Sequence, residues 1–147
     1  MYRHQVDAKG RVAVPARYRQ YLPSGSVLAV GTDGRLVMYP PDEWLALVER
    51  YKLTTTTPAE ERWLSRKVFS TAQEIDFDAQ GRIVILAEHR AFAQIGDRVV
   101  FSGMGNVVEV IGEALWDAEN GPSLDPAEFT EIHDRANQRA NERGAQS

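Results

Sequence analysis

Two arginines follow a glycine in closely similar surroundings, and their side chains have a clear potential for chemistry. Arg11 follows Gly10, and Arg82 follows Gly81. Because glycine takes a positive φ readily, each pair predicts a tight turn. A guanidinium that projects from such a turn can bind a phosphate, or the O6 and N7 atoms of guanine in the major groove of DNA. Arg11 and Arg82 are therefore the first candidates for DNA contacts.

An aspartate stands four residues before each of these arginines, as Asp7 before Arg11 and Asp78 before Arg82. Each aspartate could form a salt bridge that stiffens the turn. The same pairing could also hold the arginine ready for DNA, so both roles can exist together. The residues predicted to organise the turns are Asp7, Gly10, Asp78 and Gly81.

Other basic residues near the turns have less specific interpretations. Lys9 and Arg3 are predicted to contact phosphates, which positions a protein on DNA without reading its sequence. Arg17, Arg19 and Arg90 follow the turns. For these three, a solvated face or a contact between subunits is at least as good an explanation as a contact with DNA.

The chain repeats itself at a constant offset of 71 residues. Residues 7–19 recur as residues 78–90, with Asp, Ala, Gly, Arg, Ala and Arg identical. The register continues without a gap to Val37 and Val108. Such a repeat predicts one structural unit that occurs twice.

Each copy is predicted to hold four short strands and one helical turn. The stretch from Asp to Arg predicts the turn of a first hairpin, because residues with high β propensity flank it. A second strand pair is expected at residues 27–30 with 36–39, and at 99–101 with 107–111. The helical turns are expected at residues 16–21 and 87–93.

Helices are predicted after each copy. The first opens at Pro41, and the second runs from a capping box at residues 57–60 to about residue 73. After the second copy, a short helix is expected around residues 113–118 and a last one from residue 125 to about 143. No linker rich in Gly, Ser or Pro separates the copies, which favours one shared core.

Composition and charge narrow the class of protein. The chain has 147 residues, of which 43% are hydrophobic and 26% charged, as in ordinary globular proteins. It has no cysteine, which excludes disulfides and thiolate chemistry. The net charge is −4, but residues 1–19 carry +4 and residues 112–147 carry −5. An acidic total therefore leaves room for a local site that binds an anion.

An enzyme finds little support in the residues. His4, His89 and His133 have no partner at the spacing of metal ligands or of a catalytic triad. Glu74, Asp76 and Asp78 alternate along an expected strand, either into solvent or as a weak cation site. Residues 103–106 lack the lysine and helix of a phosphate loop. We expect no catalytic residue, no metal and no cofactor.

The repeated segments resemble the MraZ family, tandem relatives of the AbrB-type transcription regulators. The resemblance rests on residues 7–19, 78–90, 39–44 and 103–109, and it spans about residues 1–120. It implies an α+β, mainly β fold: a pseudo-symmetric double-split β-barrel of two AbrB-like, swapped-hairpin units, each followed by helices. The chain departs from the family pattern at Gln80, Leu86 and His89, where the first copy or the family has Lys, Pro and Leu.

The resemblance also implies a function. It indicates a sequence-specific transcriptional regulator that binds double-stranded promoter DNA, at direct repeats upstream of the division and cell-wall gene cluster. The regulator would act as a ring-shaped homo-oligomer, with the number of subunits left open. The location expected for it is cytoplasmic and nucleoid-associated. The short apolar runs, with no charged-then-apolar opening segment, predict neither membrane insertion nor secretion.

The domain organisation expected from these patterns has four parts. Residues 1–43 form the first AbrB-like unit, residues 44–71 connecting helices, residues 72–115 the second unit, and residues 116–147 an acidic C-terminal helical tail. The alternative function is an AbrB-type antitoxin or a self-assembling interaction module. The duplication favours the regulator, whereas the acidic tail keeps the alternative open.

Overall fold

The computed structural model describes residues 2–120 and 125–145. They belong to two compact units, Met1–Trp116 and Asp117–Ser147, which are described separately. The strands are β1 (Tyr2–Gln5), β2 (Arg11–Ala13), β3 (Val27–Val30), β4 (Leu36–Tyr39), β5 (Gln73–Glu74), β6 (Arg82–Val84), β7 (Arg98–Gly103) and β8 (Val108–Gly112). The helices are α1 (Ala16–Arg19), α2 (Pro41–Arg50), α3 (Ala59–Thr71), α4 (Ala87–Phe92), α5 (Glu113–Asn120) and α6 (Pro126–Ala145).

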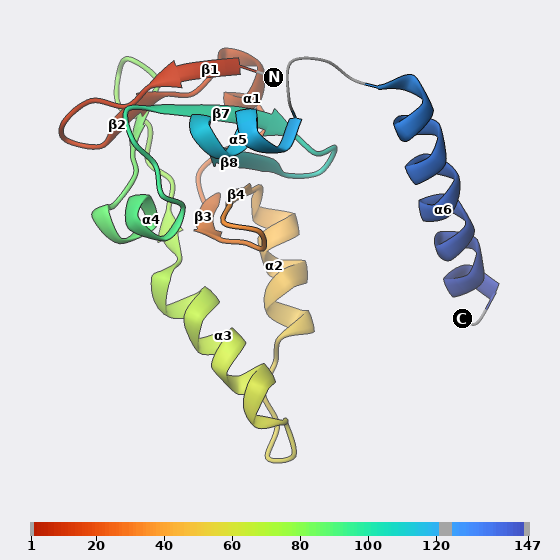
Figure 1. Ribbon diagram of the computed structural model, residues 1–147. Coiled ribbons are helices and arrows are strands. Elements are labelled where there is room, and N and C mark those ends of the chain that lie inside the picture. Colours follow the sequence, from red (N-terminus) through yellow and green to blue (C-terminus); the bar gives the residue numbers. More distant parts are fainter. Residues whose placement is uncertain (1, 121–124, 146–147) are drawn as a thin grey trace. The chain divides into compact units, whose positions relative to one another are not determined.

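The first unit contains two antiparallel sheets (Figure 1). Six strands form one sheet in the order β1-β7-β8-β4-β3-β5, and β2 pairs with β6 in a two-stranded ribbon. Together with the helices, these sheets confirm the α+β fold class predicted from the sequence. The second strand pair expected in each copy is present, as β3 with β4 and β7 with β8.

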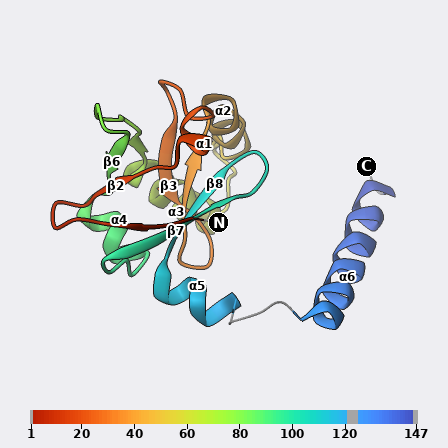
Figure 2. The ribbon, with the colours of Figure 1, turned by 90° about the horizontal axis from the view of Figure 1, so that it is seen from above.

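The two sequence repeats exchange their first strands. β1 of the first repeat pairs with β7 of the second (Figure 1), and β5 of the second repeat pairs with β3 of the first. Figure 2 labels β2 and β6, which also come from different repeats and pair with each other. The simple hairpin that the residues alone predict around each turn is therefore wrong in its strand partners, whereas the exchange agrees with the swapped-hairpin units that the family resemblance implies. The chain does turn there, but the two strands that flank the turn pair with strands of the other repeat. Neither repeat can complete its sheet alone.

The register of the ribbon is reciprocal. Val12 pairs with Ile83, which is its own counterpart at the offset of 71 residues. In the large sheet, Val37 pairs with Glu109 and Met38 with Val108, so counterparts again exchange places. A two-fold axis that relates the repeats would produce both patterns.

The main core lies between the ribbon and the large sheet. Val12 and Ile83 point inward from the ribbon and join a cluster that includes Leu28, Met38 and Phe101 from the large sheet. Each of these five side chains is at most 3% exposed. Since burying such side chains drives folding, this cluster holds the ribbon against the sheet.

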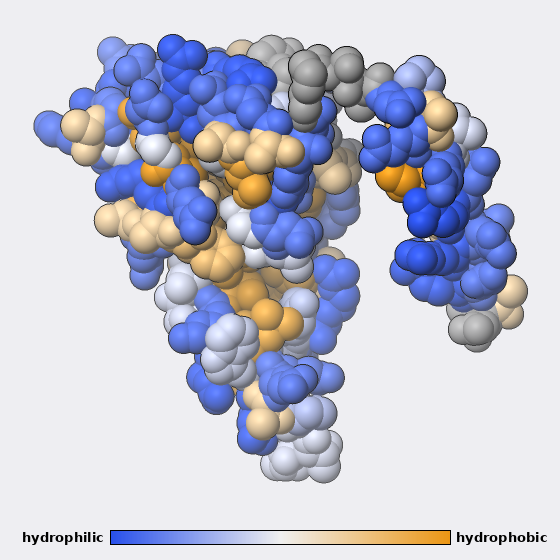
Figure 3. Space-filling model, in the orientation of Figure 1, coloured by the Kyte–Doolittle hydropathy of each residue, from blue (hydrophilic) through white to orange (hydrophobic). Residues whose placement is uncertain are grey.

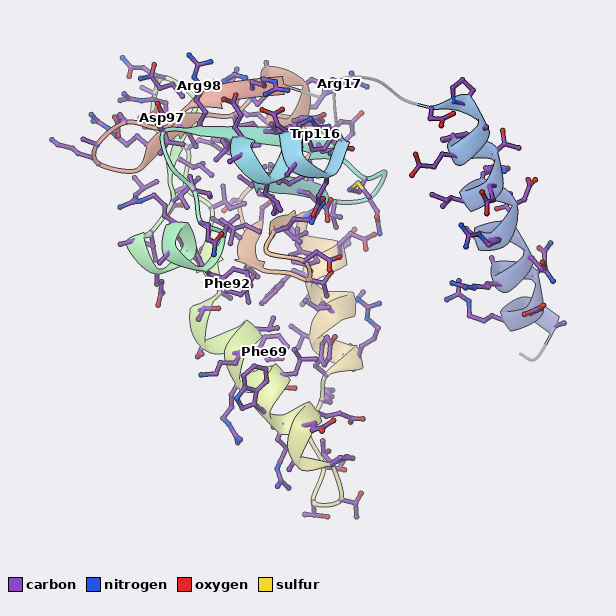
Figure 4. The ribbon with its side chains drawn as sticks, viewed as in Figure 1. Arg17, Phe69, Phe92, Asp97, Arg98 and Trp116 are labelled. Carbon is purple, nitrogen blue, oxygen red and sulfur yellow. The ribbon has the colours of Figure 1, made fainter. Side chains whose placement is uncertain are left out.

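A smaller core lies where α2 and α3 cover β3. Ala29, Leu47 and Val68 are buried there. Phe69 packs edge-on against Trp44, with 5.6 Å between ring centroids, and against Tyr51 at 6.3 Å. Figure 4 labels Phe69 on α3. Aromatic packing of this kind fixes the two helices beside each other.

The start of α3 differs from the expected capping box. Pro58 occupies the N-cap position, and no side chain caps the helix there. The Thr57 hydroxyl instead accepts a hydrogen bond from the Thr54 amide at 2.7 Å. The helix also ends at Thr71 rather than about residue 73, because the extended backbone of Ala72 leads into β5.

The second unit contains α6, a helix of 20 residues with no buried residue. Its start agrees with the sequence, since the Asp125 carboxylate accepts the Ala127 amide at 3.0 Å. The rings of Phe129 and His133 stack on the helix surface with 5.8 Å between centroids. Across residues 2–120 and 125–145, no helix has the length and apolar character needed to cross a membrane.

Candidate nucleic-acid interface

The first turn is organised by the Asp7 carboxylate. Asp7 Oδ1 accepts the amides of Lys9 at 2.9 Å and Arg11 at 2.8 Å, and Oδ2 accepts Arg11 Nε at 2.7 Å. The Asp7 amide donates to the Arg11 carbonyl at 3.0 Å, and the Gly10 amide donates to the Asp7 carbonyl at 3.0 Å. Gly10 has φ +82°, a conformation that favours glycine. One carboxylate therefore fixes both the backbone of the turn and the arginine.

The second turn repeats this geometry. Asp78 Oδ1 accepts the amides of Gln80 and Arg82 at 2.9 Å each, and Oδ2 accepts Arg82 Nε at 2.8 Å. Gly81 has φ +74°. In both turns, an aspartate thus accepts two backbone amides and an arginine Nε, and a glycine takes a positive φ.

The hydrogen bonds also affect the charge of the aspartates. Backbone donation from Arg11 is the largest cause that lowers the pKa of Asp7 below its ordinary value. Arg82 lowers the pKa of Asp78 in the same way. A hydrogen bond to the charged form favours that form, so both carboxylates are ionised at neutral pH and both ion pairs persist.

The ribbon presents both arginines on its outer face. Arg11 pairs with Val84, and Arg82 pairs with Ala13, so the arginines are diagonal neighbours. Cα atoms in such positions lie about 7–8 Å apart. Ala13 and Val84 are exposed beside them, whereas the residues between point into the core. The result is a solvent-facing, two-stranded ribbon with one guanidinium near each end.

The arginines keep part of their binding capacity. The side chains of Arg11 and Arg82 are 36% and 31% exposed. Within residues 2–120 and 125–145, each guanidinium has an acceptor for Nε, while its two terminal nitrogens have no protein acceptor. Planar terminal donors are suited to paired acceptors such as phosphate oxygens or the O6 and N7 edge of guanine.

The other two predicted contacts lie in different places. Lys9 is exposed at the tip of the first turn, where the second turn has the uncharged Gln80. Arg3 lies on β1, and its Nη1 is 3.2 Å from Glu113 Oε2. Arg3 is therefore paired with an acid on α5, whereas Lys9 belongs to the turn.

Two arginines that sequence analysis left without a specific role contact the turns. Arg19 lies against Gly81, and Arg90 lies against Gly10, so each reaches the turn of the other repeat. Their equivalence was visible in the repeat, but their contacts were not, because these depend on how the repeats interleave.

The three histidines lie on three different elements, β1, α4 and α6. His89 is fully buried, with Nε2 2.6 Å from the Thr71 carbonyl oxygen. His4 packs edge-on against Phe101, and burial lowers its pKa. His133 lies on α6 in the second unit. In the described ranges, no three His, Asp or Glu side chains are grouped so as to hold a metal ion.

The acidic strand and the glycine-containing loop also have structural explanations. Asp78 accepts a hydrogen bond within its own turn, from Arg82 Nε. Glu74 lies on β5, where it pairs with Val27 of β3. These two acids therefore have structural roles in the turn and in the sheet. The Met104 amide donates to the Val107 carbonyl at 2.8 Å in the loop between β7 and β8. This loop is a hairpin connection, as expected.

A separate apolar groove lies between α2, α3, α4 and the adjoining strands. Its volume is about 630 Å³, and its lining includes Tyr39, Leu47, Trp63, Leu64 and Phe92. Trp63 is 57% exposed and Phe92 is 46% exposed. Figure 3 shows hydrophobic side chains on the body of the first unit, and Figure 4 labels Phe92. Exposed apolar patches of this kind are typical of interaction surfaces.

Comparison with known proteins identifies the family. The chain matches the family model described as "MraZ protein, putative antitoxin-like" over residues 1–66 and 68–140. This match extends the likeness beyond residue 120 into α6.

Curated relatives agree with this family match. The chain is 40% identical to the transcriptional regulator MraZ of Desulfitobacterium hafniense (strain DSM 10664 / DCB-2) over 78% of its length and 80% of the relative. It is 34% identical to that of Thermomicrobium roseum over 84% and 91%, and 40% identical to that of Heliobacterium modesticaldum over 81% and 83%. The relatives are named for regulation of transcription, which is not a class of enzyme. The chain belongs to the MraZ family of transcriptional regulators.

Proposed function

We propose that the chain regulates transcription by binding double-stranded promoter DNA through the ribbon of β2 and β6. The observation that carries this proposal is the pair of outward-facing arginines, each held by an aspartate in a turn at the end of the ribbon. The major groove admits a two-stranded ribbon, and arginine can read guanine there. Lys9 in the same turn as Arg11 and Arg3 on β1 would add phosphate contacts.

The DNA target follows from the family resemblance. We infer direct repeats upstream of the division and cell-wall gene cluster as the binding sites, with the protein acting in the cytoplasm on the nucleoid. A single ribbon offers few phosphate contacts, so useful affinity requires several ribbons on one DNA. A homo-oligomeric ring facing repeated sites would meet this requirement.

The apolar groove supports such an assembly. Trp63 and Phe92 expose aromatic surface that a second copy would bury. We expect Trp63→Glu to reduce the oligomer to smaller species while the circular dichroism spectrum stays native. Light scattering after size-exclusion chromatography measures the mass. An unchanged mass would show that the groove takes no part in the contact between copies.

The test of DNA binding is a gel-shift titration on the protein's own upstream DNA and on scrambled DNA, at low and moderate salt. Arg11→Ala is compared with Arg66→Ala, which removes an exposed arginine from α3. A specific complex that weakens with salt, that Arg11→Ala loses and that Arg66→Ala keeps would support the proposal. Absence of any specific complex would contradict it.

The exposed helix α6 favours a second candidate function. None of its described residues is buried, and Phe129 and Ile132 are 61% and 50% exposed. A binding module of the antitoxin kind would use such a helix to hold another protein. Without specific DNA binding, and with a stable complex formed through α6, this second function would be the better account.

A further inference from the structure

Arg19 and Arg90 occupy equivalent places below the two turns. A Cβ built on Gly81 would lie 1.8 Å from Arg19 Nη1, and one built on Gly10 would lie 1.8 Å from Arg90 Nη1. No side chain fits into such a distance, so each guanidinium lies directly against the backbone of a glycine. Both glycines are buried as a result.

The contacts cross from one repeat to the other. Arg90 lies on α4 of the second repeat and meets the first turn, whereas Arg19 lies on α1 of the first repeat and meets the second turn. Arg90 Nη1 also donates a short hydrogen bond to the Ile85 carbonyl. The Ile85 amide in turn donates to the Gly10 carbonyl at 2.8 Å. Arg90 and the first turn therefore share one segment of backbone.

The second turn has a related connection. The Gly81 carbonyl accepts the Val14 amide at 3.1 Å, and Val14 precedes the short helix that carries Arg19. Each turn is thus joined to the segment just before the opposite helix, and the arginine of that helix fills the space that a side chain at the glycine would occupy.

The two arginines also differ from Arg11 and Arg82 in charge pairing. Arg11 and Arg82 are paired with aspartates. In the part of the chain that the structure describes, Arg19 and Arg90 have no carboxylate within ion-pair distance. An ion pair between them and an acid thus does not explain their place below the turns.

We propose that Arg19 and Arg90 are positioning residues, each holding the DNA-binding turn of the opposite repeat. Arg90 holds the turn of Asp7 to Arg11, and Arg19 holds the turn of Asp78 to Arg82. The positioning of the turns by Arg19 and Arg90 follows from these contacts alone. Their effect on DNA binding rests on the proposed function. Each turn is thereby held in place by an arginine of the opposite repeat.

Hydrogen exchange of single amides tests the positioning without DNA. The amides of Lys9, Gly10 and Arg11 are bonded within the first turn, and those of Gln80, Gly81 and Arg82 within the second. Arg90→Lys keeps the charge but loses the planar guanidinium, and we expect about tenfold faster exchange in the first turn alone. Arg19→Lys should speed hydrogen exchange in the second turn alone. Arg66→Lys should change exchange in neither turn.

Faster exchange in the turn of the same repeat, equal changes in both turns, or no change in either would overturn the inference. A general loss of stability would appear as equal changes. Arg90→Gln, measured in the same way, checks that the result does not depend on lysine. If exchange follows the crossed pattern but the protein binds no specific DNA, the positioning stands and the proposed function fails.

A double-mutant cycle extends the test to the complex with DNA. Arg90→Lys alone is expected to weaken specific binding about tenfold, but less than about twofold when Arg11 is already alanine. In the Arg82→Ala background, the full tenfold loss should remain. Coupling to Arg82 instead of Arg11 would contradict the crossed arrangement.

Discussion

The two turns share one hydrogen-bond framework and differ at their tips. Asp7 and Asp78 accept the same set of amides and the same arginine Nε, with distances that agree within 0.1 Å. Lys9 of the first turn is replaced by Gln80 in the second. The hydrogen bonds are therefore part of the structure that both turns require. The charge of the residue at the tip is not, and it differs between the repeats.

The residues after the ribbon lead to the same conclusion. Pro15 and Leu86 precede the short helices with nearly the same backbone, at φ −53° and ψ 137° against φ −60° and ψ 151°. Proline fixes this φ, but leucine reaches it as well. The replacement thus leaves the backbone that leads into the short helix nearly unchanged.

The largest difference between the turns is expected from substitution of their glycines. A Cβ at Gly10 would lie 2.6 Å from the Ile85 carbonyl oxygen, in addition to the Arg90 side chain. At Gly81 the close atoms belong to the flexible Arg19 side chain. With the cost of a positive φ included, Gly10→Ala should destabilise by about 2–4 kcal/mol and Gly81→Ala by about 1–2 kcal/mol. Urea denaturation measures both, and a larger loss for Gly81→Ala would contradict this difference.

The arginines should differ in their effect on DNA binding. Arg11→Ala is expected to weaken specific binding by about 1–3 kcal/mol, with folding and assembly intact. Arg82→Ala should cost less, because no lysine accompanies it in the second turn. Titration of each variant on the same DNA gives the two values. An Arg11→Ala protein that unfolds or disassembles would show that the arginine is structural.

The sequence predicted the turns but not their surroundings. The repeat and the glycines located Asp7, Arg11 and their counterparts, because a turn is a local structure. Local residue patterns alone could not reveal that β1 pairs with β7, since strand partners depend on contacts far apart in the chain, and only the family resemblance implied such an exchange. The contact of Arg90 with Gly10 follows from that exchange and was missed for the same reason. The predicted capping box was wrong because Pro58, which has no side-chain acceptor, occupies the N-cap position.

Exchanging the tip residues should transfer electrostatic affinity from one turn to the other. Lys9→Gln removes one phosphate contact, so the slope of log K against log salt should become shallower by about 0.9. Gln80→Lys should make it steeper by a similar amount if the second turn also meets DNA. An unchanged slope for Gln80→Lys would indicate that only the first turn approaches phosphates.

The smallest expected difference between the two turns is in how their aspartates make the stability of the protein depend on acidic pH. Hydrogen bonds from Arg11 and Arg82 lower the pKa of Asp7 and Asp78 in the folded protein. Their stabilising contribution is present above the unfolded pKa of about 3.9 and is lost as the pH falls through the lower folded pKa. Asp7→Asn and Asp78→Asn should each reduce this acid dependence to a similar degree in urea unfolding between pH 6 and pH 3. Unequal reductions would show that the two frameworks differ after all.

We propose above all that the two ribbon arginines together carry specific DNA recognition. Fluorescence anisotropy titration of the Arg11→Ala/Arg82→Ala double variant on upstream and scrambled DNA tests this most directly, with Arg62→Ala/Arg66→Ala as a control of equal charge. We expect the double variant to bind both DNAs with nearly equal affinity, while the control keeps its preference for upstream DNA. A double variant that still prefers upstream DNA as strongly as the unchanged protein would contradict it.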